Sequence, residues 1–292
     1  MIKSIIKESI TTLLSRPKLI RLAFLMTFGH TIYRTYLITY FLNYILRERY
    51  ESGVELSDAF VYIINKIQDF DIRGFIISFI LIILIGNFLL YPIGEASLVY
   101  YIQDNTKKLS SSISKGIRKF FVMFEFNGLG FAFGMYTIIT IMIRLRMMGI
   151  LDNIILKILM IIRGTIVTFA TFFRPYTKYY IVTKDLWVFD ALKKSIYLTL
   201  TNISLTFKGV IFEMLLFWRF IINTLLVIAV PLTLIYIAIF FNIIEYVRIE
   251  TIIRISAGIM ILLIAYINGI FEAFFTNYRY KIFEKAEKNL NE

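Results

Sequence analysis

Residues 154–173 read IILKILMIIRGTIVTFATFF, and this stretch decides the fold class. Its only charged side chains are Lys157 and Arg163. A helix of 20 residues is about 30 Å long, which matches the thickness of the hydrocarbon core of a bilayer. The stretch therefore predicts a transmembrane helix.

Five further stretches have the same apolar character and the necessary length. Of the 292 residues, 59% are hydrophobic and 18% are charged, and the mean hydropathy is +0.75. Soluble domains carry roughly 25% charged residues, so the surplus apolar surface must face lipid. We therefore expect an all-α fold, a polytopic transmembrane bundle forming one domain over 1–292. The six predicted spans are 22–46, 75–103, 120–143, 154–173, 209–241 and 255–278.

The basic residues predict the orientation of these spans. The segment before the first span, the loops 104–119 and 174–208 and the tail after 278 together hold 20 Lys and Arg residues. The loops on the opposite side hold eight. Because cytoplasmic loops are enriched in Lys and Arg, both termini are predicted to be cytoplasmic, in a multi-pass protein of the plasma (inner) membrane. The net charge of +12 then reports orientation, and no nucleic-acid partner is expected.

The cytoplasmic segments resemble one another, which suggests an internal repeat. Lys7-Glu8-Ser9-Ile10, Ser114-Lys115-Gly116-Ile117 and Lys193-Lys194-Ser195-Ile196 precede spans one, three and five. Each segment is typical of a basic amphipathic helix at the inner membrane surface, which anionic lipids attract. Three units, each an interfacial helix followed by a hairpin, would explain the pattern. Common selection for Lys, Ser and Tyr at inner-leaflet flanks is the alternative.

This architecture resembles a group of six-span prokaryotic membrane families that includes the membrane domain attached to some glycerophosphodiester phosphodiesterases. Short patches carry the resemblance, Pro92-Ile93-Gly94-Glu95-Ala96 and Asp190-Ala191-Leu192-Lys193-Lys194-Ser195. The soluble phosphodiesterase domain is absent from this sequence. The resemblance therefore implies a membrane-embedded module and no phosphodiesterase activity.

Charged residues inside the predicted spans are the candidate functional residues. A charge near the middle of a bilayer costs about 2.5–3.5 kcal/mol on insertion scales, so it usually faces the bundle and has a partner. Helix rise places four glutamates about 8–14 Å inside the cytoplasmic boundary, and three arginines deeper, near the midplane. These residues are Glu95, Glu125, Glu213, Glu272, Arg34, Arg163 and Arg219. His30 shares one face of the first span with Arg34.

Two interpretations of these layers remain open. In the first, the charges form ion pairs that hold the bundle together. In the second, they line a polar cavity open to the cytoplasm, where arginines attract an anionic group such as a lipid phosphate and glutamates exchange protons or cations. Some of the charges could instead reach an interface by snorkelling.

Several chemistries lack their motifs. The chain has one histidine and no cysteine, which excludes thiolate metal sites and argues against a histidine-based one. No catalytic residue, cofactor or metal is predicted. Gly130 and Gly134 form a small-xxx-small pattern, which predicts close helix packing.

The sequence thus favours a non-enzymatic membrane protein, a transporter-like or lipid-interacting module. Its expected partners are membrane lipids, anionic at the cytoplasmic face, and a protein partner is an open alternative. The first alternative function is a structural or scaffold subunit that recruits a partner through the interfacial helices. The second is an intramembrane enzyme acting on a lipid head group.

Overall fold

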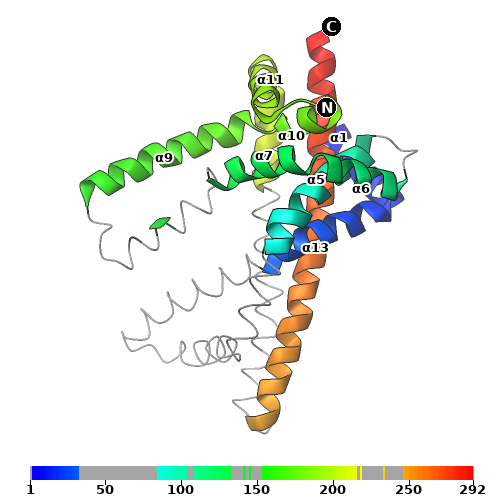
Figure 1. Cartoon of the computed structure of the whole chain (residues 1–292), viewed down its shortest axis with the longest axis vertical. Helices are drawn as coiled ribbons and strands as arrows, with labels where there is room; N and C mark the ends of the chain where they lie inside the picture. The colour runs from blue at the N-terminus through cyan, green and yellow to red at the C-terminus, as the bar shows by residue number, and fades with distance from the viewer. Residues whose placement is uncertain are drawn as a thin grey trace. The chain divides into compact units, whose positions relative to one another are not determined.

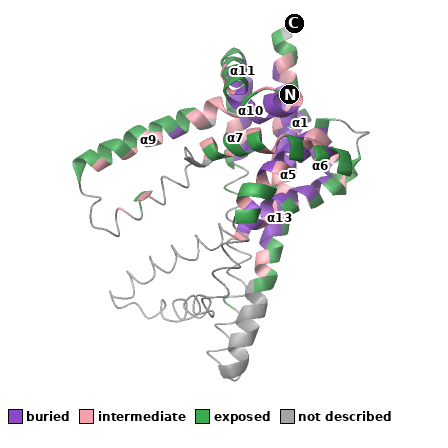
Figure 2. Ribbon diagram, in the orientation of Figure 1, coloured by how far each residue is buried: buried purple, intermediate pink, exposed green. Residues whose placement is uncertain are grey.

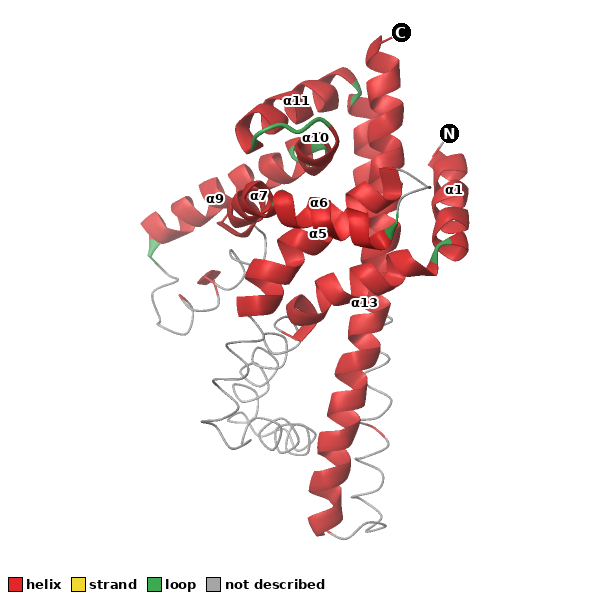
Figure 3. Cartoon of the chain, turned by 45° about the vertical axis from the view of Figure 1, so that its right-hand side comes forward, coloured by secondary structure: helices red, strands yellow, loops and turns green. Residues whose placement is uncertain are grey.

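The computed structural model describes residues 2–32, 84–103, 108–132, 141–142, 145, 153–215, 218, 233 and 246–291 (Figure 1). Within these residues every regular element is a helix, joined by short loops (Figure 3). The all-α prediction is therefore confirmed for the described part of the chain. Two predicted site residues, Arg34 and Arg219, and the whole segment between the first two predicted spans, 47–74, lie outside the described residues.

The described helices follow one another along the chain. A helix over 17–32 follows the first element, and Ile203–Leu215 is helical after the break at Asn202. The labelled elements are α1 (Ile2–Ser15), the π-helix η1 (Leu84–Leu90), α5 (Tyr91–Gln103), α6 (Leu109–Arg118), α7 (Phe120–Ala132), α9 (Ile154–Phe173), α10 (Thr177–Thr183), α11 (Val188–Thr201) and α13 (Tyr246–Asn291).

Contacts within the chain group its residues into two compact units, and the single domain over 1–292 stays a prediction. The first unit comprises Met1–Leu22, Pro92–Glu213 and Ala273–Glu292. The second comprises Ala23–Tyr91 and Met214–Glu272. The first unit thus gathers the three predicted interfacial helices and the adjoining parts of the predicted hairpins.

Some boundaries of the predicted spans coincide with helix ends in the structure, and others lie inside longer helices. α7 begins at Phe120, and α9 covers the predicted stretch 154–173. The last helix, expected to end near 278, continues to Asn291, so the basic tail is helical. Its sequence explains the continuation, because residues 279–291 contain no Gly or Pro and are rich in Lys and Glu.

Length and composition identify one described helix that could cross a membrane, the part Gly258–Leu290 of α13. Helix α11 and the helix Ile203–Leu215 would provide a second if the bent pair counts as one span, and their axes differ by 101°. Within the described residues six spans are therefore not confirmed. A membrane location is compatible with this finding.

The three segments predicted to be amphipathic are helices, and each ends at a break followed by a new helix. α1 breaks at Arg16, before Pro17, whose fixed φ and missing N–H suit the first turn of a helix. α6 breaks at Lys119, and α11 breaks at Asn202. Each amphipathic helix therefore leads directly into a more apolar helix.

A buried serine lies seven residues before each break. Ser9, Ser112 and Ser195 are fully buried. Four residues further along each helix lie the buried residues Leu13, Gly116 and Thr199, which continue the same stripe. The predicted repeat had aligned Gly116 with Ser9, so the structure shifts the equivalence in α6 by about one helical turn.

These small residues allow each helix to lie close to another part of the chain. In α6, a Cβ added to Gly116 would lie 2.6 Å from the carbonyl oxygen of Ile93 and would also meet Oγ of Ser97. In α11, Ser195 Oγ donates to the Phe173 carbonyl over 2.9 Å and accepts from the Tyr176 N–H over 3.2 Å.

The N-terminal helix makes the corresponding contact with the C-terminal helix. Asn277 Nδ2 of α13 donates to the Ser9 carbonyl over 3.2 Å, and Lys281 Nζ lies 2.5 Å from Glu8 Oε1. α6 therefore lies on α5, α11 on the α9–α10 junction and α1 on α13. In each case the partner is the end of an even-numbered predicted span.

Replacing Gly116 by alanine tests this packing. We expect Gly116→Ala to lower the melting temperature of the detergent-purified protein, because overpacking typically costs about 1–3 kcal/mol and the nearest atoms include backbone. Ser111→Ala, an exposed site on the same helix, is the matched control and should change stability little. An unchanged melting temperature for Gly116→Ala would show that α6 does not lie on α5 as described.

Candidate functional site

The first unit contains a buried ion pair that involves a predicted site residue. Lys178 Nζ of α10 donates to Glu95 Oε1 of α5 over 3.0 Å, and the two side chains are 6% and 5% exposed. Both residues lie in segments that are buried almost throughout, over Pro92–Val99 and Thr177–Val182. The pair removes the net charge that either residue alone would bring into this core.

The second oxygen of Glu95 is less well satisfied. Oε2 is buried and has no hydrogen-bond partner within the described residues, and the same holds for the neighbouring Thr177 Oγ1. Buried polar atoms of this kind are commonly satisfied by internal water. The Glu95–Lys178 pair is therefore a polar contact in an otherwise apolar and aromatic core.

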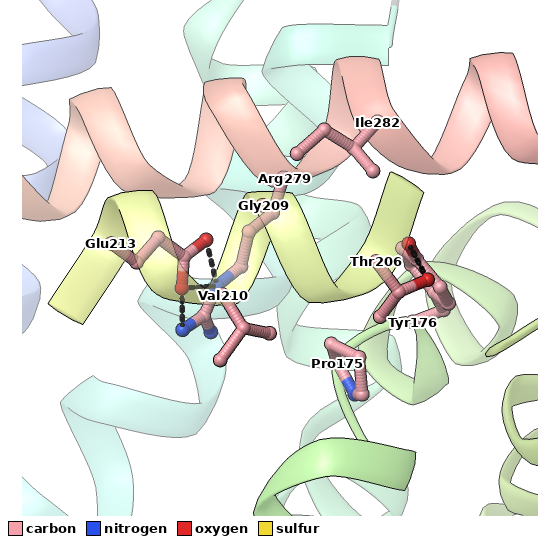
Figure 4. A pocket seen from close by; sticks show the side chains of 8 residues that line it. All are labelled: Pro175, Tyr176, Thr206, Gly209, Val210, Glu213, Arg279 and Ile282. Atoms are coloured by element: carbon pink, nitrogen blue, oxygen red, sulfur yellow. Dashed lines mark hydrogen bonds and ion pairs between the residues drawn. The ribbon is translucent and has the colours of Figure 1, made fainter. Parts of the chain in front are cut away.

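A second ion pair joins Glu213 to the C-terminal helix. Arg279 Nε lies 2.6 Å from Oε1 and 2.7 Å from Oε2 of Glu213, and Nη2 also donates to Oε2 (Figure 4). Such forked contacts fix geometry and strengthen the interaction. The Glu213 side chain is 10% exposed and that of Arg279 is 40% exposed, so this pair borders the surface.

A small recess lies beside this second pair. Its cavity volume is about 10 Å³, roughly the space that one water molecule needs. At the other end of the recess, the Tyr176 hydroxyl and Thr206 Oγ1 are hydrogen-bonded at 2.7 Å (Figure 4). The residues that line the recess are Pro175, Tyr176, Thr206, Gly209, Val210, Glu213, Arg279 and Ile282.

The tyrosine of this recess is not suited to proton transfer near neutral pH. Burial raises the pKa of Tyr176 to about 12, and the nearby Glu213 carboxylate adds to the increase. The hydroxyl therefore stays protonated at physiological pH and acts only as a hydrogen-bonding group. The carboxylate that lines the recess, Glu213, is held by Arg279, so the recess offers polar contacts but no unengaged general base.

Gly130, predicted to let two helices pack closely, instead lies against the side chain of Arg174. The place of its missing side chain is occupied by Arg174, whose Nη2 and Cζ would lie 2.5 and 2.8 Å from an added Cβ. The same guanidinium lies 4.5 Å from the centre of the Phe126 ring. Gly130 therefore makes room for a cation–π contact, and Gly134 lies outside the described residues.

In the second unit, His30 is part of a local polar contact. Its Nδ1 lies 2.9 Å from Asn87 Oδ1, and its ring centre lies 5.4 Å from that of Tyr91. An amide oxygen only accepts, so with this amide orientation Nδ1 carries the proton. Nearby, a Cβ on Gly86 would lie 2.6 Å from the Gly29 Cα, which shows that the two backbones approach closely.

The remaining predicted residues that the structure describes differ in exposure. Glu125 is exposed on α7, and Arg163 of α9 and Glu272 of α13 are half-buried. Glu272 lies in the second unit and the other three glutamates in the first. The structure therefore shows two glutamates neutralised separately, and the layered cavity stays a prediction.

Sequence reasoning missed the partners Lys178 and Arg279. Both had been counted only as cytoplasmic charges that set orientation. A local signal was present, because each stands next to tyrosines in a largely apolar run, Tyr179-Tyr180-Ile181 after Lys178 and Tyr278 and Tyr280 around Arg279. A cation beside tyrosines in such a largely apolar run indicates a buried partner.

Within the described residues, no group of three or more His, Cys, Asp or Glu side chains is placed to hold a metal ion. Comparison with protein-family models, curated proteins and solved structures finds no match for the chain. The resemblance to membrane domains of glycerophosphodiester phosphodiesterases therefore stays a prediction.

Removing one partner of the buried Glu95–Lys178 pair should destabilise the protein more than removing both partners. Glu95→Gln or Lys178→Met alone leaves one uncompensated charge, which typically costs about 3–5 kcal/mol. The double variant should recover much of this loss in a thermal unfolding assay.

Lys184→Gln is the matched control, because Lys184 forms a more exposed pair with Glu287 at 3.4 Å. Exposed pairs contribute about 0–1 kcal/mol, so little change is expected. If Glu95→Gln and Lys178→Met destabilise the protein additively, the two side chains are not coupled as described.

Proposed function

We propose that this chain is a non-enzymatic, six-span membrane protein, a lipid-interacting structural module with both termini in the cytoplasm. It consists of three repeated units, each an interfacial helix followed by a transmembrane hairpin. Its buried charges hold the bundle together and do not conduct ions.

The equivalence of α1, α6 and α11 supports the repeat. Each helix carries a buried serine seven residues before its break, and each leads into an apolar helix. α6 and α11 lie on the end of the hairpin that precedes them. α1 has no preceding hairpin and lies on α13, which belongs to the last one. If the three units form a ring, the last hairpin precedes the first unit, which explains why α1 lies on α13.

The surface of α9 supports burial in lipid. Most of its large apolar residues are exposed, with values from 48% to 72% (Figure 2). A water-soluble protein rarely exposes a continuous apolar surface of this extent. The residues concerned are Ile154, Ile155, Ile158, Leu159, Ile161, Ile162, Ile166 and Phe169.

The observation that carries the structural role is that Glu95 and Glu213 each form an ion pair with a basic residue. A carboxylate that moves protons or cations needs access to water and freedom to change its partner. Glu95 is instead held by Lys178 in a buried core, and Glu213 is held by a forked contact with Arg279. The recess beside Glu213 is smaller than a usual ligand pocket.

Topology mapping with single cysteines tests the membrane arrangement, and the chain contains no native cysteine to interfere. In spheroplasts, an impermeant maleimide should label Glu55→Cys and Asp152→Cys. Ser4→Cys, Ser111→Cys and Thr201→Cys should react only after permeabilisation. Labelling of any of the latter three in intact spheroplasts would refute the six-span topology.

The structural role is tested separately in reconstituted vesicles. The wild-type protein should produce no proton or potassium flux above that of empty vesicles. A flux that Glu95→Gln or Glu213→Gln abolishes, in a protein that remains folded, would establish a transporter and overturn the proposal.

A further inference from the structure

We infer that α1, α6 and α11 lie in the cytoplasmic lipid interface and bind the anionic surface of that leaflet through one repeated apolar stripe flanked by basic residues. This inference rests on the proposed membrane topology. It adds the surface that contacts the lipid and the chemical class of the lipid.

The apolar stripe occupies equivalent positions in the three helices, counted from the break that ends each one. At every position all three helices have Ile or Leu. The residues are Ile6, Leu109 and Leu192 at the first position, Ile10, Ile113 and Ile196 at the second, and Leu14, Ile117 and Leu200 at the third.

The stripe is progressively uncovered toward the break. The first position is half-buried in all three helices. At the last position Leu14, Ile117 and Leu200 are 78%, 56% and 53% exposed. At this position each of the three helices therefore has a Leu or Ile side chain that the described residues leave more than half exposed.

Each helix has three faces in the same rotational order. The apolar stripe follows the buried stripe by one residue, as Ile10 follows Ser9, which is a rotation of about 100°. The remaining face is polar and includes the residues that follow the last stripe position. These are Ser15 in α1, Arg118 in α6 and Thr201 in α11, and all three are exposed.

This order suits a helix at a membrane surface. The buried stripe contacts protein, the apolar stripe can enter the boundary between head groups and acyl chains, and the third face meets water. The apolar surface also continues past the break. Phe121 of α7 is 78% exposed, and Ile203 and Phe207, which follow α11, are both 53% exposed. Lipid that covers these helices would cover the stripe as well.

Charge complementarity indicates an anionic leaflet. Exposed Lys3 and Lys7 lie on α1, and exposed Lys193 and Lys194 lie on α11. α6 contributes Lys115 and the exposed Arg118 in its last turn. Basic residues beside an apolar stripe are the combination that anionic lipid surfaces attract.

Aromatic residues at α11 fit the same depth. Trp187, at the N-terminal boundary, is 67% exposed, and Tyr197 is 59% exposed. Trp and Tyr favour the interface because their rings are apolar and their polar atoms can reach water.

The experiment uses an environment-sensitive fluorophore on single cysteines in vesicles of phosphatidylglycerol and phosphatidylcholine. Leu14→Cys, Ile117→Cys and Leu200→Cys report the stripe. Ser15→Cys, Ser114→Cys and Thr201→Cys, at exposed positions on the polar face, are the matched controls. Stripe labels should be quenched by a nitroxide placed at head-group depth and protected from aqueous iodide, and the controls should show the reverse.

Two outcomes would overturn the inference. If iodide quenches stripe and control labels equally, the stripe faces water. If neither quencher reaches the stripe labels, another protein surface covers them. Protein that alkaline carbonate washes from the vesicles would instead refute the membrane topology, so the two failures are distinguishable.

The lipid class is tested on the purified full chain by native mass spectrometry. Phosphatidylglycerol should be retained in preference to phosphatidylcholine. Neutralising Lys3, Lys7, Lys193 or Lys194 to Gln should lower the affinity for phosphatidylglycerol by about fivefold per lysine at low ionic strength. Equal retention of the two lipids by the wild type would rule out the anionic preference.

Discussion

The close packing of three short helices onto the ends of three others is the constraint on which this structure depends. It requires small residues where helix meets neighbour, and the sequence provides Ser9, Gly116 and Ser195 at those contacts. At Ser9 the helix backbone accepts a hydrogen bond from its partner, and at Ser195 the small side chain bonds to the backbone of its partner. The breaks that follow each helix then direct the chain from this packed region into the apolar helices.

The buried ion pairs follow from the same packing. Glu95 lies two residues from Ile93 and Ser97, which contact α6, and Lys178 lies two residues after Tyr176, which bonds to Ser195 of α11. The pair thus joins α5 to α10, the two helices on which α6 and α11 lie, in a core of low polarity. Such pairs stabilise little beyond an apolar core of the same shape, but losing one partner is costly. They therefore favour the correct pairing of units over alternatives that would leave a charge unpaired.

The sequence predicted the helical class, the starts of α7 and α9 and the helical nature of the three basic segments, because each depends on local periodicity and length. It also identified Glu95 and Glu213 as residues that need partners. It did not identify Lys178 and Arg279, because pairing depends on which helices meet, and a count of cytoplasmic charges treats all cations alike. The equivalence of Ser112 with Ser9 was missed for a related reason. Gly116 and Ser112 lie on the same helix face, and only the position of the break distinguishes them.

The central claim, a ring of units closed by α1 on α13, is tested most directly by zero-length cross-linking of the unmodified protein in membranes. A carbodiimide joins a carboxylate to an amine only when the two are in contact. The account predicts an amide bond between Glu8 and Lys281, detected by mass spectrometry of the digested protein, with the Lys184–Glu287 link as an internal reference. The Glu8–Lys281 link should disappear in Glu8→Gln. Recovery of the reference link without any Glu8–Lys281 link would contradict the closed ring.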